Sequence, residues 1–147
     1  QLGIHTIQPV ISKRCDVKEV SANKFLRWQK CALSAAEQAH LQHVPHIKTP
    51  MSLSEYLQKA AFFEQKIICW EEARPTQALL NLLTVKTGES LAILIGPEGG
   101  FGKEEVEACE LAGFERAYLT PSILRTENAG FSAISMLIGH LYSRLNP

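Results

Sequence analysis

Hydrophobic and polar segments alternate most clearly in the last third of this 147-residue chain. The apolar run Ser90–Ile95 predicts a buried strand, and the periodic segment Lys103–Ala112 predicts a helix. That helix has acidic residues at its start, where the helix dipole favours them, and Gly113 ends it. A second strand is expected over Arg116–Leu119, and a long helix from Glu127 to Leu145. Strands that alternate with helices predict an α/β fold with a mostly parallel sheet and helices on both faces.

The first half of the chain has a weaker pattern, in which turn and capping residues mark the boundaries. We expect strands over Ile7–Ile11 and Lys66–Trp70, a helix from the N-cap Ser21 to about His43, a second helix after the N-cap Ser52, and a short helix over Thr76–Leu83.

The amino-acid composition limits the classes of protein and partner that the chain is expected to have. Fifteen basic and fifteen acidic residues balance, so a whole-domain attraction to nucleic acid is not expected. The apolar runs are too short to span a bilayer, which predicts no membrane partner. Four scattered cysteines form no C-x-x-C pair, and they indicate reduced thiols in a cytoplasmic protein.

The start of the chain has the pattern of a helix end. Leu2-Gly3 is typical of a last helical residue followed by its glycine cap, yet the helix itself is missing. We therefore expect the chain to be the C-terminal fragment of a longer protein.

A glycine-rich turn over Leu94–Phe101 follows the first strand of the last third and is the first candidate for chemistry. It is not a phosphate-binding loop, because Pro97 stands where a glycine is required and Glu104 replaces the hydroxyl residue that would hold magnesium. Glu98 would also repel phosphates. A loop with one carboxylate and many backbone amides suits a ligand with positive and negative groups, whereas the simpler interpretation is a tight turn without a ligand.

A second loop, over Ile123–Ala129, follows the next strand. Thr126 could be the N-cap of the last helix, with Glu127 in its first turn. Arg125 does not fit this interpretation, because a cation at a helix N-terminus opposes the dipole. We expect it to face an anionic partner instead.

Together, Gly-Pro-Glu-Gly-Gly-Phe at 96–101 and Ile-Leu-Arg-Thr-Glu-Asn-Ala at 123–129 resemble the RsmE family of ribosomal RNA methyltransferases, in the SPOUT superfamily. Upstream segments, among them Ser12-Lys13-Arg14, follow the family's order. The resemblance implies a SPOUT-type α/β fold with a C-terminal trefoil knot, and one catalytic domain over residues 1–147 without the family's N-terminal RNA-binding β-barrel domain. It further implies a homodimer that uses S-adenosylmethionine to methylate N3 of a uridine in 16S ribosomal RNA of the small subunit.

The site residues carried by these motifs fall into three groups. Arg125 is expected to polarise uracil or orient the nucleotide, and Glu127 or Glu98 to accept the N3 proton or hold the cofactor's amino group. The expected cofactor-binding residues are Leu94, Ile95, Gly96, Pro97, Glu98, Gly99, Gly100, Leu119, Ile123, Leu124, Arg125 and Ala129. The expected RNA-binding residues are Lys13, Arg14, Lys24 and Arg27, which belong to the only basic cluster along the chain.

Two further observations bear on these expectations. Thr120-Pro121-Ser122 and Asn128 depart from the family's usual residues, which affects the details of RNA contact. His40, His43 and His46 lack a completing carboxylate or thiol, so we expect no metal site. Two alternatives stay open: methylation of another RNA by the same fold, or a non-catalytic RNA-binding or ribosome-assembly protein.

Overall fold

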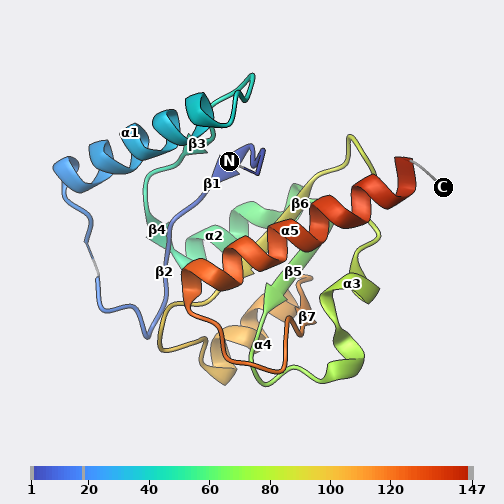
Figure 1. Cartoon of the computed structure of the whole chain (residues 1–147). Coiled ribbons are helices and arrows are strands. Elements are labelled where there is room, and N and C mark those ends of the chain that lie inside the picture. Colours follow the sequence, from blue (N-terminus) through green and yellow to red (C-terminus); the bar gives the residue numbers. More distant parts are fainter. Residues whose placement is uncertain (1, 18, 146–147) are drawn as a thin grey trace.

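The computed structural model describes residues 2–17 and 19–145 of the chain (Figure 1). Its strands are β1 (Thr6–Ile7), β2 (Val10–Ile11), β3 (His46–Ile47), β4 (Met51–Ser52), β5 (Gln65–Cys69), β6 (Leu91–Ile95) and β7 (Glu115–Ala117). Its α-helices are α1 (Ala22–Gln38), α2 (Leu53–Lys59), α3 (Leu79–Leu82), α4 (Lys103–Leu111) and α5 (Thr126–Leu145). Short 3-10 helices are η1 (Ala60–Phe62) and η2 (Pro75–Gln77).

Every strand pairing among these elements is parallel. The main sheet has the order β6-β5-β7, so the strand that comes first in the chain lies in the middle. Two smaller parallel pairs, β1 with β3 and β2 with β4, continue the α/β arrangement through the N-terminal half. The prediction of a mostly parallel sheet is confirmed.

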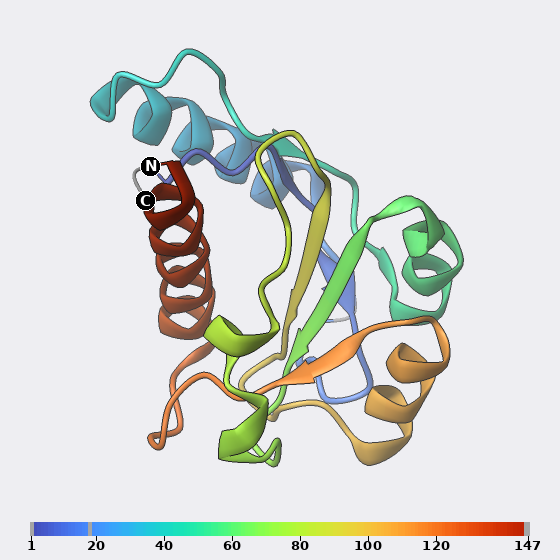
Figure 2. The same ribbon diagram turned by 90° about the vertical axis from the view of Figure 1, so that its right-hand side faces the viewer.

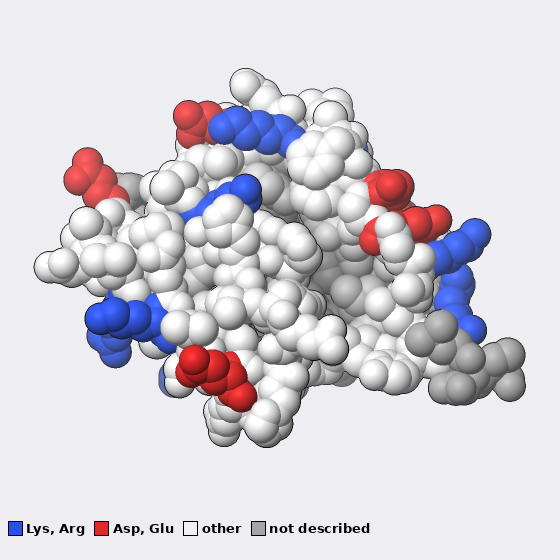
Figure 3. Space-filling model, turned by 90° about the horizontal axis from the view of Figure 1, so that it is seen from above, with Lys and Arg blue, Asp and Glu red and all other residues white. Residues whose placement is uncertain are grey.

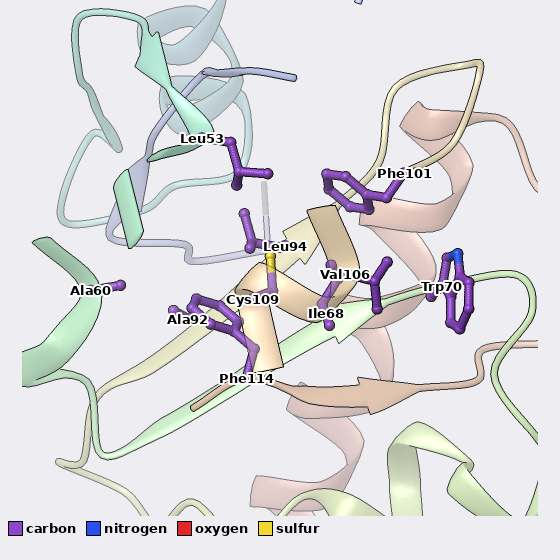
Figure 4. Packing of buried hydrophobic residues seen from close by; sticks show 10 residues of the cluster. All are labelled: Leu53, Ala60, Ile68, Trp70, Ala92, Leu94, Phe101, Val106, Cys109 and Phe114. Carbon is purple, nitrogen blue, oxygen red and sulfur yellow. The ribbon is translucent and has the colours of Figure 1, made fainter. Parts of the chain in front are cut away.

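Helices cover both faces of the main sheet, as predicted (Figure 2). Neighbouring residues of a strand point to opposite faces, and Ile67 and Ile68 of β5 are both fully buried. Around Ile68, one apolar cluster packs the sheet against α2 and α4 (Figure 4). Around Ile67, a second cluster packs it against α3 and α5.

The predicted single strand over Ile7–Ile11 is wrong, because the segment divides into β1 and β2 with different partners. Pro9 has no N–H to donate to a ladder, and its carbonyl accepts a hydrogen bond from the Met51 amide. The Gln8 side chain bonds the Thr49 carbonyl at 2.8 Å. At Pro9 the segment therefore changes its partner, so that β1 pairs with β3 and β2 pairs with β4.

The first long helix begins as predicted, with the Ser21 side chain accepting from the Lys24 amide. Its predicted end near His43 is wrong, because α1 stops at Gln38. His40 adopts a left-handed backbone with φ of 50°, and the Leu41 amide bonds back to the Ala36 carbonyl. These bonds form a Schellman ending in which His40 takes the place usually held by glycine.

The boundaries of the next helices differ less from the predicted ones. The Ser52 cap is confirmed, and with Glu55 it forms a capping box at α2. The predicted helix over Thr76–Leu83 is interrupted at Ala78, which bridges Tyr118 beside the main sheet and thus divides η2 from α3. No helix in the described part of the chain is long and apolar enough to cross a membrane.

Candidate functional site

The two loops that the sequence singled out meet at the carboxyl end of the main sheet. The β6–α4 loop carries the glycines, and the β7–α5 loop leads into α5. The Thr126 hydroxyl donates to the Gly96 carbonyl at 2.9 Å, which joins the two loops directly. Thr126 is therefore not the N-cap, because α5 already includes it and the Arg125 carbonyl accepts the Ala129 amide at the helix start.

A pocket lies between these loops, where open α/β sheets bind ligands. The predicted cofactor-binding residues that line it are Ile95, Gly96, Pro97, Glu98, Gly100, Leu119, Ile123, Leu124 and Ala129. Three others do not line it. Leu94 is buried in the Ile68 cluster, Gly99 lies against Arg14, and Arg125 is exposed outside the lining.

A third wall of the pocket was missed from the sequence. It comes from the end of β5, where Cys69, Trp70 and Glu71 line the pocket beside the two loops. Further lining residues that were not predicted are Tyr118, Thr120, Pro121, Ser122 and Thr126. The signal was partly present, since the β5 strand was predicted, but its central place in the sheet was not.

Charge in the pocket has one sign. Among the described residues that line it, Glu71 and Glu98 are acidic, and none is Lys, Arg or His. Burial raises the pKa of the Cys69 thiol to about 12, so this sulfur is neutral. The Trp70 indole N–H is buried and has no hydrogen-bond partner within residues 2–17 and 19–145.

Close packing explains why the β6–α4 loop needs its glycines. Gly100 has φ of +65°, a conformation that favours glycine, and its amide bonds the Pro97 carbonyl at 2.9 Å. A Cβ at Gly100 would lie 2.2 Å from the Glu71 Oε1 atom, and one at Gly96 would lie 3.2 Å from the Phe101 ring. The glycines thus allow the loop to lie against Glu71 and Phe101.

Residues just after β2 hold the same loop from outside. The Glu105 carboxylate, which is buried, accepts from the Lys13 amide at 2.7 Å and from the Gly102 amide at 3.0 Å. The Arg14 guanidinium donates to the Gly99 carbonyl at 2.9 Å. The Lys13 ammonium pairs with Glu104, which raises the pKa of Lys13 and lowers that of Glu104.

The predicted RNA-binding residues divide between two places. Lys13 and Arg14 lie against the glycine loop, whereas Lys24 and Arg27 are exposed on α1, which Figures 1 and 2 place away from that loop. Lys24 lies over the Trp28 ring at 5.8 Å. Figure 3 shows acidic and basic side chains interspersed on one face of the molecule. No group of His, Cys, Asp and Glu in the described part could hold a metal ion.

The three predicted catalytic residues lie at the exposed side of the site. Glu98 lines the pocket, while Arg125 and Glu127 flank the start of α5 outside its lining. Within residues 2–17 and 19–145, the Arg125 guanidinium has no hydrogen bond or ion pair. It is therefore available to an anionic partner, as its position at a helix start suggested.

The fold and pocket define an α/β protein with a pocket at the carboxyl ends of its parallel strands. Residues 1–138 match the family described as the RNA methyltransferase domain. The chain belongs to this family.

Its similarity to individual proteins agrees with that assignment. Over 140 residues it is 34% identical to ribosomal RNA small subunit methyltransferase E of Buchnera aphidicola (subsp. Schizaphis graminum), covering 93% of this chain and 55% of the relative. The same-named protein of Bacillus subtilis is 32% identical over 144 residues, covering 93% and 56%. The chain thus spans little more than half the length of these curated relatives.

Solved structures show the same fold. The Neisseria gonorrhoeae ribosomal RNA small subunit methyltransferase E, bound to S-adenosylmethionine, superposes with a TM-score of 0.82 at 32% identity, over 95% of this chain and 56% of that one. A Legionella pneumophila methyltransferase in complex with the same cofactor gives 0.80 at 30% identity, over 94% and 56%.

Proposed function

We propose that residues 1–147 form one catalytic domain that transfers a methyl group from S-adenosylmethionine to N3 of a uridine in 16S ribosomal RNA. The observation that carries the proposal is the acidic pocket between the two family-typical loops. The relatives named as ribosomal RNA small subunit methyltransferases support the choice of RNA.

The pocket residues fit this cofactor. S-adenosylmethionine bears a sulfonium, an ammonium and one carboxylate, so its net charge is positive, and Glu71 and Glu98 complement it. A nucleotide phosphate would meet two carboxylates and no lining cation among the described residues. Gly96 and Gly100 line the pocket with backbone in place of side chains.

Residues of the chain then act on the uracil. When bound, S-adenosylmethionine supplies a methyl group made electrophilic by its positive sulfur. Uracil N3 carries a proton, and its electron pair is unavailable until that proton leaves. Glu98 or Glu127 accepts the proton, and Arg125 stabilises the negative charge that develops on the uracil carbonyls.

Assembly and threading form part of the proposal. α5 supports a homodimer, because its large apolar side chains Phe131 and Tyr142 are about three-fifths exposed. Sedimentation equilibrium should give twice the chain mass, and a monomer at micromolar concentration would contradict the dimer.

The bond between Thr126 and Gly96 supports a trefoil knot, since it holds the C-terminal segment against the β6–α4 loop.

Methyl transfer tests the proposed reaction. The chain is incubated with labelled S-adenosylmethionine and small ribosomal subunits that lack the modification, and the modified base is mapped. We expect label at N3 of one uridine, and a loss of about a hundredfold in rate for Arg125→Ala with cofactor affinity retained. Cofactor binding without transfer would indicate another RNA substrate or a non-catalytic protein. Unchanged turnover in a folded Arg125→Ala variant would refute the role of Arg125.

A further inference from the structure

Glu71 is a charged residue of the pocket that neither loop motif contains. It directly follows Trp70 at the end of β5, the central strand of the main sheet, and it lines the pocket from between the two loops. Its carboxylate has no hydrogen bond or ion pair within residues 2–17 and 19–145. An unpaired carboxylate in such a pocket is available to a cationic ligand group.

The glycine loop is shaped around this carboxylate. A Cβ at Gly100 would lie 2.2 Å from Oε1, 3.1 Å from Cδ and 3.3 Å from Oε2 of Glu71, so the whole carboxylate occupies the space beside that glycine. Gly100 also has a left-handed backbone, a conformation that favours glycine, at the end of the Pro97–Gly100 turn. The Glu71 carboxylate therefore lies at the pocket, against the backbone of the glycine loop.

The neighbouring acid shows that this placement is specific. Glu72 does not line the pocket, and its carboxylate lies 3.7 Å from the Lys103 ammonium at the start of α4. Two adjacent glutamates at the end of one strand thus have different surroundings. One is paired with a lysine, and the other faces the pocket with no cation to neutralise it.

We propose that Glu71 is the residue that discriminates the cofactor from the spent product by charge. The inference rests on the proposed function. Transfer of the methyl group leaves the carbon–sulfur electron pair on sulfur, so the sulfonium becomes a neutral thioether. A carboxylate in the same pocket attracts the positively charged S-adenosylmethionine, and it loses the part of this attraction that the sulfonium supplies when the ligand is S-adenosylhomocysteine. The ammonium and carboxylate groups are common to both molecules, so their contacts cancel in the comparison.

Dissociation constants of the two ligands test the inference. Isothermal titration is performed with the unaltered chain, Glu71→Gln, Glu71→Asp and the matched control Glu72→Gln. We expect Glu71→Gln to weaken S-adenosylmethionine about fivefold, as for a unit charge near 4 Å in a largely aqueous setting, with S-adenosylhomocysteine nearly unchanged. Glu71→Asp should keep part of the preference, and Glu72→Gln all of it.

Other outcomes separate the two proposals. Equal weakening of both ligands, or no change in either, would overturn the role of Glu71 and leave the proposed function standing. Failure of the unaltered chain to bind either ligand would overturn the proposed function and this inference together. Because Glu71 is exposed, a folded variant is expected, and its thermal midpoint provides the check.

Discussion

Replacing Gly100 by alanine tests whether the shape of the glycine loop is set by backbone conformation alone or also by Glu71. The φ of +65° costs an L-residue about 1–2 kcal/mol. The new methyl group would also lie 2.2 Å from Glu71 Oε1, so that side chain must rotate, at about 0.5–1.5 kcal/mol. We therefore expect Gly100→Ala to lower the free energy of unfolding by about 2–3 kcal/mol.

Gly88 offers a matched control. It also has a positive φ, of 93°, but a Cβ there would meet nothing within 4 Å. Both replacements restrict the unfolded chain equally, so this contribution cancels between them. Gly88→Ala should therefore show the backbone strain without the steric contact, and the difference between the two variants should be about 1 kcal/mol.

Urea and thermal unfolding, followed by circular dichroism, measure these differences. For a chain of this size, 1 kcal/mol corresponds to about 2–4 °C in Tm, so Gly100→Ala should melt about 4–12 °C lower. In a Glu71→Ala background the cost of Gly100→Ala should fall to that of Gly88→Ala. Equal costs for the two glycines in the unaltered background would refute the reasoning about Glu71, and the double-mutant cycle would then show no coupling.

Three further predictions concern groups outside the glycine loop. Glu105→Gln leaves one oxygen for two amide donors, so we expect a loss of about 1–3 kcal/mol in urea unfolding, and an unchanged midpoint would contradict this. The capping hydrogen bonds lower the pKa of Glu55, so they stabilise the fold above the ordinary value of 4.5, and this stabilisation is lost as pH falls through the lowered pKa. In a plot of the free energy of unfolding against pH, Glu55→Gln should flatten the decline on the acid side, and identical declines for the two proteins would argue against the prediction. Burial raises the pKa of Cys69 and Cys109 to about 12, so a thiol reagent at pH 8 should modify exposed Cys31 first, and equal rates by mass spectrometry would disprove this protection.

Two helix ends show how far the sequence determines the fold. Both α1 and α4 end in a Schellman motif, in which the second residue past the cap donates to a carbonyl five residues back. At α4 the left-handed position is Gly113, and the end was predicted correctly. At α1 it is His40, a residue that adopts this conformation far less readily than glycine, and the prediction extended the helix too far. A helix end can be predicted from the sequence when the residue at the left-handed position is one, such as glycine, that favours this conformation.

The candidate functional site shows a different limit on what can be predicted from the sequence. Each loop motif was located correctly, because glycine, proline and charge patterns are local features of the sequence. Glu71 was missed because its importance comes from the strand order β6-β5-β7, which brings β5 between two strands that follow it in the chain. Leu94 and Gly99 were wrongly assigned to the pocket because they are close in sequence to residues that line it. Nearness in sequence to lining residues does not say which way a strand residue points, and Leu94 points into the core.

The glycine loop owes its defined shape to residues far from it in the chain. Glycine loses more conformational freedom on folding than other residues, so a loop rich in it does not hold one conformation by itself. Here the restraints come from Thr126, 30 residues beyond Gly96, and from Lys13 and Arg14, 92 and 85 residues before their partners. Because Arg14 bonds the loop and Lys13 bonds Glu105, which also holds the Gly102 amide, a phosphate bound by either residue would act beside the segment that lines the pocket. Mutations at either residue should therefore be assayed for cofactor affinity as well as for RNA affinity, since a loss of RNA binding alone would show that the two contacts are independent.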